Sequence, residues 1–105
     1  MYIFEQLGDQ VGYEKLAPTT STGFTATLIK PTSGEKLGYS AKVVRIIPED
    51  YPIRYREDGT APTATEGPKI DAGTEHLIIG TENITNFRCI DTAAGASSVK
   101  CLFYF

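Results

Sequence analysis

The stretch YPIRYREDGTAPTATEG at residues 51–67 decides how the fold is interpreted, because it joins a clear strand pattern to a clear turn pattern. Residues 51–56 alternate along the chain, and the apolar face of that alternation consists of Tyr51, Ile53 and Tyr55. Such alternation predicts a strand whose tyrosine face points inward. Asp58-Gly59 follows and predicts a turn, because glycine tolerates positive φ and aspartate hydrogen-bonds nearby backbone. Residues 61–67, rich in Pro and Thr, predict an extended loop at the edge or end of a sheet.

Short strand patterns recur on both sides of this stretch. Aromatic, β-branched or alternating runs predict further strands at residues 1–7, 24–29, 39–47, 75–80, 84–92 and 99–105. Residues 8–22 predict a loop with two or three strand residues near Tyr13. Pro48 limits the length of the strand predicted at residues 39–47. A β-bulge near Thr85 would turn neighbouring apolar residues inward together, and the pattern leaves that question open.

Residues 99–105, VKCLFYF, carry apolar groups on both faces, so we expect this strand to be central in a sheet or covered by a partner. No segment has helical spacing long enough to cross between parallel strands. The chain therefore predicts one all-β domain over residues 1–105, a single-domain antiparallel β-sandwich of jelly-roll-like type with seven to eight short strands.

Composition excludes several classes of function. The chain has 105 residues and a net charge of −3, and its ten Lys and Arg are spread along the sequence. Nucleic-acid binding needs a concentrated basic surface, which we do not find. No apolar run approaches the roughly twenty residues of a membrane span. The opening MYIFEQLGDQ also lacks the pattern of a signal peptide, so we expect a chain that stays in the cytosol or joins an assembly built there.

Residues that could support catalysis are few. His76 is the only histidine, and neither a nucleophile nor an orienting partner for it can be named, which favours a structural histidine. Two adjacent carboxylate pairs, Glu49-Asp50 and Glu57-Asp58, stand at strand ends without the spacing of a calcium loop. We therefore expect no enzyme activity, no cofactor and no metal site.

Two further pairs have more than one interpretation. Arg54 and Arg56 share one face of a strand and form either a solvated face with a local ion pair or a contact face for a partner. Cys89 and Cys101 fall in consecutive predicted strands and could be cross-strand neighbours, and two buried thiols are favoured over a disulfide. We predict Arg54, Arg56 and Tyr104 as residues that contact a partner.

The same central stretch resembles a family of small proteins. The run PIRYREDGTAPTATEG at residues 52–67, followed by Ile70, Gly73 and the strand end FRCI at residues 87–90, is similar to small structural proteins of tailed-bacteriophage virions. The likeness covers residues 51–105. Cys89 stands where these proteins more often have an aromatic or aliphatic residue, and Lys69 where they have an apolar one.

The resemblance implies a capsid decoration or cement protein, or an accessory protein of the head or tail. Its partners would be the major capsid protein, other virion proteins and further copies of itself in a homo-oligomer, and it would reside in the virion after assembly in the host cytoplasm. Two alternatives come from the residues. A carbohydrate- or ligand-binding β-sandwich module would use tyrosines such as Tyr39, Tyr51 or Tyr55, and a small hydrolase would depend on His76.

Overall fold

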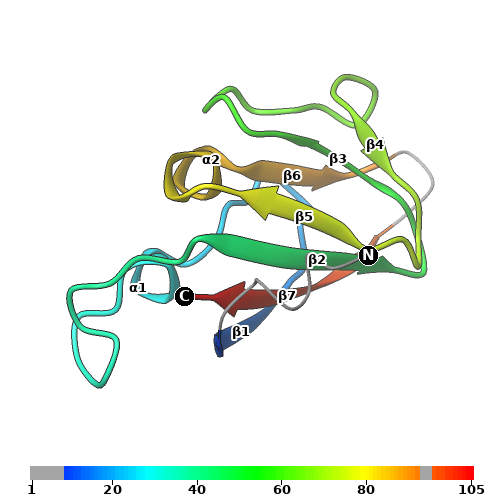
Figure 1. Cartoon of the computed structure of the whole chain (residues 1–105). Helices are drawn as coiled ribbons and strands as arrows, with labels where there is room; N and C mark the ends of the chain where they lie inside the picture. Colours follow the sequence, from blue (N-terminus) through cyan, green and yellow to red (C-terminus); the bar gives the residue numbers. More distant parts are fainter. Residues whose placement is uncertain (1–8, 93–95) are drawn as a thin grey trace.

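The computed structural model describes residues 9–92 and 96–105, in which two antiparallel sheets enclose one core (Figure 1). The four-stranded sheet has the strand order β1 (Gln10–Leu16), β7 (Ser98–Tyr104), β2 (Val43–Glu49) and β5 (His76–Ile79). The three-stranded sheet has the order β4 (Lys69–Ile70), β3 (Ile53–Arg56) and β6 (Arg88–Asp91). Two short helices are α1 (Ala26–Ile29) and α2 (Thr81–Asn86). The predicted all-β sandwich is therefore confirmed, with seven strands among the described residues.

β7 is one of the two inner strands of the larger sheet. It pairs along its length with β1 on one side and with β2 on the other. Its alternate residues Val99, Cys101 and Phe103 are fully buried against the core. Of the two expectations for this strand, a central place in a sheet is the one the structure confirms.

The core between the sheets is completed by aromatic rings. Phe24 and Phe87 stack with ring centroids 4.5 Å apart, and Phe24 meets Phe103 edge-on at 5.3 Å. Tyr55 of β3 lies 6.1 Å from the Phe87 ring. Because Phe87 precedes β6 and Phe103 lies on β7, these contacts join the two sheets.

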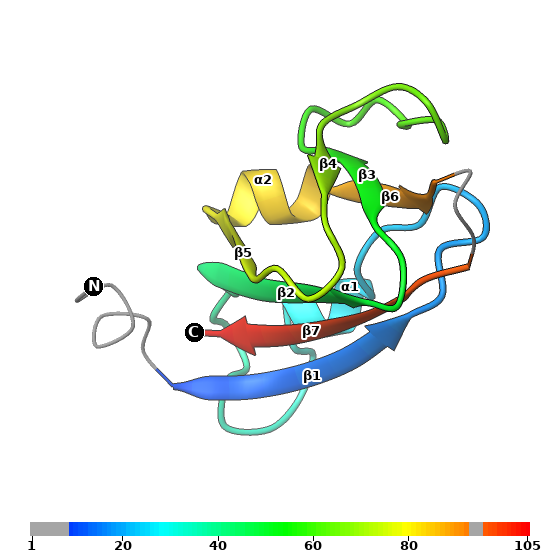
Figure 2. The same ribbon diagram turned by 90° about the vertical axis from the view of Figure 1, so that its right-hand side faces the viewer.

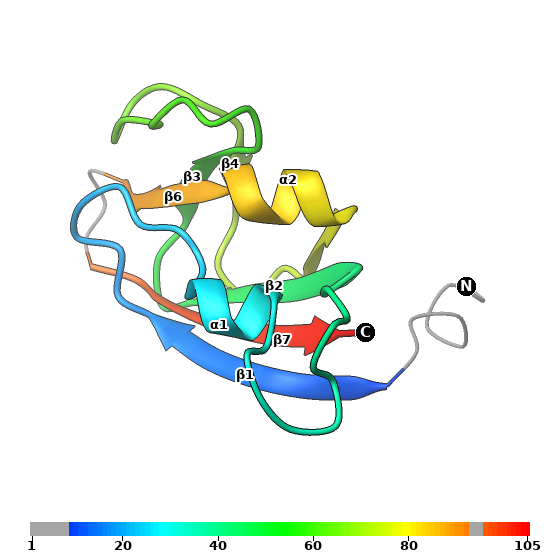
Figure 3. The ribbon, with the colours of Figure 1, turned by 90° about the vertical axis from the view of Figure 1, so that its left-hand side faces the viewer.

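The strand predicted at residues 24–29 is wrong, because this segment forms the single turn α1. Leu28 and Ile29 of this turn reach the core, together with Phe24 from the loop directly before it. Glu14 of β1 fixes the approach to this turn, since its carboxylate accepts hydrogen bonds from the Thr25 amide at 2.8 Å and the Thr25 hydroxyl at 2.7 Å. Figure 3 shows α1 in front of the four-stranded sheet.

The strand predicted at residues 84–92 is half wrong. Its first part belongs to α2, and only Arg88–Asp91 forms β6. Ile84, Phe87 and Cys89 are nevertheless all fully buried, which is the grouping that a bulge near Thr85 would have given. Here the three residues are buried together because the helix α2 ends at Asn86 and the strand begins at Arg88.

The loop predicted at residues 8–22 is also wrong in part, since β1 occupies most of its first half. β1 is an edge strand with exposed Val11 and Tyr13, so it lacks the apolar run that marks a buried strand. Gly12 fits closely against β7: a Cβ there would lie 3.2 Å from the Cβ of Phe103. The strand predicted at residues 1–7 lies outside the described residues.

The stretch at residues 51–67 is largely as predicted. β3 begins at Ile53, which is fully buried, and Tyr55 packs against the core, whereas Tyr51 precedes the strand and is exposed. Gly59 has a φ of 84°, as the predicted turn requires, and residues 61–67 form a loop. Pro48 does not end its strand, because β2 continues to Glu49. Among the described residues, no helix is long and apolar enough to cross a membrane.

We expect Phe87→Ala to lower the free energy of unfolding by about 3–5 kcal/mol, because it removes a buried ring that joins both sheets. Urea denaturation followed by circular dichroism measures the loss. Leu37→Ala is the control, since Leu37 is 59% exposed and its loss should change stability by no more than about 0.5 kcal/mol. A loss below about 1 kcal/mol for Phe87→Ala would contradict its central place in the core.

Candidate functional site

Arg54 holds the loop that follows β3. Its guanidinium donates one hydrogen bond to the backbone oxygen of Ala64 at 3.2 Å and another to that of Gly67 at 2.7 Å. Both carbonyls belong to the loop predicted at residues 61–67. Charge-assisted bonds to backbone fix the path of the loop rather than the identity of its side chains. Arg54 is thus a residue that orders this loop.

Arg56 forms a second anchor at the start of the same loop. Its Nε donates to Asp58 Oδ1 at 3.1 Å, and its Nη2 is paired with Asp58 Oδ2. Asp58 Oδ1 also accepts a hydrogen bond from the Thr60 amide at 3.1 Å. These hydrogen bonds, the one from Arg56 first, lower the pKa of Asp58 to about 2. The pair is exposed, so it is the local ion pair that one interpretation of the sequence expected.

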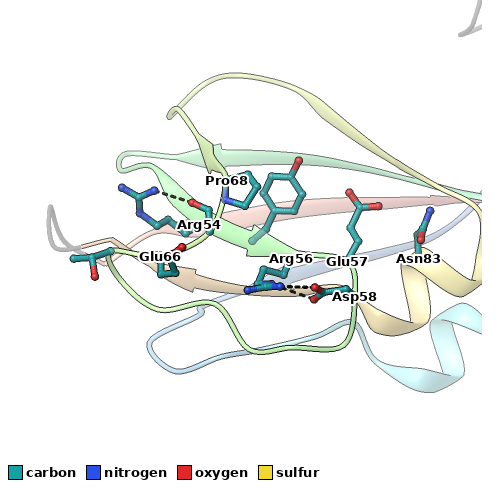
Figure 4. A pocket seen from close by; sticks show the side chains of 10 residues that line it. Arg54, Arg56, Glu57, Asp58, Glu66, Pro68 and Asn83 are labelled. Atoms are coloured by element: carbon teal, nitrogen blue, oxygen red, sulfur yellow. Dashed lines mark hydrogen bonds and ion pairs between the residues drawn. The ribbon is translucent and has the colours of Figure 1, made fainter.

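An open groove lies beside these two anchors, and Figure 4 shows its side chains. Its volume is about 710 Å³, and it is lined by Arg54, Tyr55, Arg56, Glu57, Asp58, Thr65, Glu66, Gly67, Pro68 and Asn83. We call it the arginine groove. Burial and the charge of Glu57 raise the pKa of Tyr55, so the phenol is neutral at pH 7. The lining offers carboxylates, an amide and a phenol, groups that suit hydrogen bonds to a polar ligand.

The residues considered for catalysis do not form a catalytic set in the described part of the chain. The His76 ring lies 5.0 Å from the Tyr55 ring, in a tilted contact at the edge of the core. Cys89 and Cys101 are buried free thiols, as predicted, but they lie in different sheets and are not cross-strand neighbours. Burial raises the pKa of Cys89 to about 12 and raises that of Cys101 as well, so both thiols are protonated at neutral pH.

In each of the two adjacent carboxylate pairs, Glu49-Asp50 and Glu57-Asp58, one member forms an ion pair with a basic side chain. Glu49 is 3.4 Å from the Lys100 ammonium, and Asp58 pairs with Arg56. Across residues 9–92 and 96–105, no three His, Cys, Asp or Glu side chains gather closely enough to hold a metal ion.

Tyr104 lies on β7 in the four-stranded sheet and does not line the arginine groove. It is only 8% exposed, and its hydroxyl accepts a hydrogen bond from Arg45 Nη1 at 3.2 Å. The structure therefore brings Arg54 and Arg56 together at one groove and places Tyr104 on the four-stranded sheet. What a partner could reach at Tyr104 is the surface around it.

That surface is the side of the four-stranded sheet that faces away from the core. In Figure 2, seen from the side opposite to Figure 3, α1 lies behind this sheet. The strand register defines the side chains on this side, which we call the outer face: Gln10, Tyr13, Lys15, Val43, Arg45, Ile47, Glu49, Leu77, Ile79, Ser98, Lys100, Leu102 and Tyr104. Glu75, directly before β5, joins them through its ion pair with Arg45. Half of these residues are apolar or aromatic.

The charges of the outer face are largely matched within it. Arg45 Nε lies 2.8 Å from a Glu75 carboxylate oxygen, and Lys100 Nζ lies 3.4 Å from one of Glu49. Its apolar and aromatic members other than the buried Tyr104 are partly or strongly exposed, with Ile79 at 52% and Tyr13 at 51%. An apolar surface whose ions are already paired suits contact with a protein better than binding of a charged small molecule.

Sequence reasoning noticed only one strand of this surface. The apolar groups on both faces of residues 99–105 indicated a partner or a central place, and the central place is the one that the structure confirms. The outer-face contributions of β2 and β5 could be recognised only once their register with β7 was known.

A comparison with known proteins adds nothing to this picture, since no family model, curated protein or solved structure matches the chain.

We expect Arg56→Gln to raise the pKa of Asp58 from about 2 toward its ordinary value. A carboxyl whose pKa is lowered by folding stabilises the protein above its unfolded pKa of about 3.9, and this contribution is lost as pH falls through about 2. Carboxyl carbon NMR during an acid titration measures the shift. Arg88→Gln is the control, because Arg88 bonds to Ser21 and not to Asp58. An unchanged Asp58 titration in Arg56→Gln would contradict the ion pair.

We expect Arg54→Ala to release the loop, because two carbonyls lose charge-assisted hydrogen bonds. Limited proteolysis read by mass spectrometry should detect cleavage within residues 60–66 at about ten times the wild-type rate. Arg88→Ala, which removes an arginine of β6 that bonds to Ser21 and not to this loop, should leave that rate unchanged. Equal cleavage rates in Arg54→Ala and wild type would show that the loop is ordered by other contacts.

Proposed function

We propose that this chain is a structural protein of a tailed-bacteriophage virion, most specifically a capsid decoration or cement protein that stabilises the particle through protein–protein contacts. It would join the particle after assembly in the host cytoplasm, with the major capsid protein or other virion proteins as partners. In this proposal it performs no catalysis and needs no cofactor.

The observation that carries the proposal is the outer face of the four-stranded sheet. The core is complete without it, since the inward residues of β7 and β2, such as Phe103 and Ile46, are already fully buried. The outer face nevertheless keeps Val43, Leu77 and Leu102 on the other side of the same strands. A second apolar side on a sheet with a complete core favours a role in binding another protein.

The shape of this surface also supports a protein partner. Ligand pockets for small molecules are concave and enclose most of their ligand. The outer face is the broad side of a sheet, and such surfaces suit sheets or helices of another protein. The resemblance of residues 51–105 to virion structural proteins supports the more specific part of the proposal.

A carbohydrate- or ligand-binding module, such as one from a tail or fibre, is the second candidate. The arginine groove favours it, because Tyr55, Glu57 and Asn83 place an aromatic ring and hydrogen-bonding groups along one open depression. Tyr39 and Tyr51 are exposed elsewhere on the surface. A glycan array without any signal would remove this candidate.

The first candidate predicts that the purified chain co-sediments with capsids assembled from the major capsid protein encoded beside its gene. Ile79→Glu places a charge on the outer face and should lower the bound amount at a fixed concentration by about tenfold. Leu37→Glu is the matched control, because Leu37 is exposed to a similar degree but lies outside the outer face. Absence of the wild-type chain from the capsid pellet, at any concentration up to saturation of the assay, would defeat the proposal.

A further inference from the structure

We propose that the arginine groove binds an organic cation, a guanidinium or ammonium group such as the side chain of an arginine or lysine on another protein. This inference goes beyond the proposed function, because it concerns the groove beside β3 and not the outer face of the four-stranded sheet. It also differs from the second candidate, in which a glycan would occupy this groove.

Most of the charged donors that line the groove are already used within the chain. Arg54 donates from Nε and Nη1 to two backbone carbonyls, which leaves only its Nη2. Arg56 donates from Nε and Nη2 to the carboxylate of Asp58. The side-chain nitrogen of Asn83 donates to a backbone carbonyl at 2.9 Å. A ligand would therefore find few free donors on this lining.

The acceptors of the lining are left free by comparison. Among the described residues, no group donates a hydrogen bond to the carboxylate of Glu57 or Glu66. The side-chain oxygen of Asn83 also remains, since the printed bond of this amide uses its nitrogen. Figure 4 shows Glu66 and Asn83 at opposite ends of the groove. Free acceptors along the groove suit guanidinium and ammonium groups, which carry donors and no acceptor.

The charge of the lining favours the same class of ligand. It contains the carboxylates of Glu57, Asp58 and Glu66 and the guanidinium groups of Arg54 and Arg56, so three negative charges stand against two positive ones. A ligand with a single positive charge balances this excess, whereas an anion would be repelled by the free carboxylates. Within residues 9–92 and 96–105 no three acidic, His or Cys side chains lie close enough to share a metal ion. The spread of the carboxylates thus suits an extended organic cation.

Two apolar groups of the lining suit the stem of a basic side chain. Tyr55 and Pro68 both line the groove, and Tyr55 is partly exposed. Burial and then the charge of Glu57 raise the pKa of Tyr55, so the field of this carboxylate acts beside the ring. Lysine and arginine lay their methylene stems along apolar surface and keep the charged end with polar partners. The groove offers both kinds of surface.

NMR titration of the purified full chain with N-acetylarginine methylamide tests this inference. We expect a dissociation constant of about 1–10 mM, because the groove is open and its ions are partly hydrated. The amide shifts that move should be those of groove residues, Glu57, Glu66 and Asn83 among them. N-acetylcitrulline methylamide has nearly the same shape without the charge, and it should bind at least about five times more weakly.

Two variants change the charge of the groove in opposite directions. Glu57→Gln removes a free carboxylate and should weaken binding of the arginine compound by about threefold or more. Arg56→Gln removes a positive charge and frees the Asp58 carboxylate, so it should strengthen binding by a similar factor. Glu35→Gln removes the same charge from the exposed loop between α1 and β2, outside the groove, and should leave binding within about 1.5-fold of wild type. Thermal unfolding of each variant checks that the fold is kept.

Methylguanidinium separates two sources of the cation. Weaker binding of this bare group than of the arginine compound would identify a side chain on a protein, and equal binding would identify a free small cation. Equal binding of the arginine and citrulline compounds would overturn the inference. Shifts outside the groove, or no binding up to about 50 mM, would also overturn it. None of these measurements uses capsids, so the cation site and the virion role can fail separately.

Discussion

The double pairing of β7 is the constraint on which the rest of this structure depends. β7 hydrogen-bonds to β1 on one side and to β2 on the other, so both its edges are used and only its two faces remain. The inner face supplies Val99, Cys101 and Phe103 to the core. Because side chains alternate along a strand, the same pairing places Leu102 and Tyr104 on the outer face. Core and candidate binding surface are thus two consequences of one strand and its register.

The two layers are held together by rings rather than by a continuous sheet. Phe87 stacks on Phe24, and Phe24 meets Phe103, so a ring from the loop before α1 lies between a residue of each layer. Rings with this offset and edge-on geometry contribute attraction beyond the area they bury. The short helices serve this arrangement, since the turn α1 presents Leu28 and Ile29 and the end of α2 presents Ile84 to the same core. Neither helix is long enough to be stable without that packing.

Which parts of the fold could be predicted from the sequence depends on whether they are determined by interactions between neighbours in the sequence or by tertiary packing. Turns could be predicted because their chemistry is local. At Asp58-Gly59 the glycine has a positive φ, and the aspartate carboxylate accepts a hydrogen bond from the Thr60 amide. The two short helices were not predictable, because their patterns fit a strand as well and tertiary packing decides between the two. The strand β1 was underestimated because an edge strand does not need an apolar run.

The candidate sites show the same limit. The ion pair of Arg56 with Asp58 could be inferred from spacing alone, since the two residues are neighbours across a turn. The role of Arg54 could not, because its acceptors are the backbone oxygens of Ala64 and Gly67, and carbonyls carry no signal in a sequence. The outer face depends on the register of four strands, which no single strand reveals.

The edges of the four-stranded sheet explain why we assign association to its face. An exposed edge is normally the easiest place for two sheets to join, because its backbone groups lack partners. Here one edge is β1, whose register with β7 shifts between Gln10 and Gly12 and whose outer residues include Lys15. The other edge is β5, which is only four residues long. Irregular, charged and short edges all discourage pairing of strands between chains. The face between these edges has apolar side chains whose contacts require no backbone partner, and for this reason we propose the face, and not an edge strand, as the surface that binds another protein.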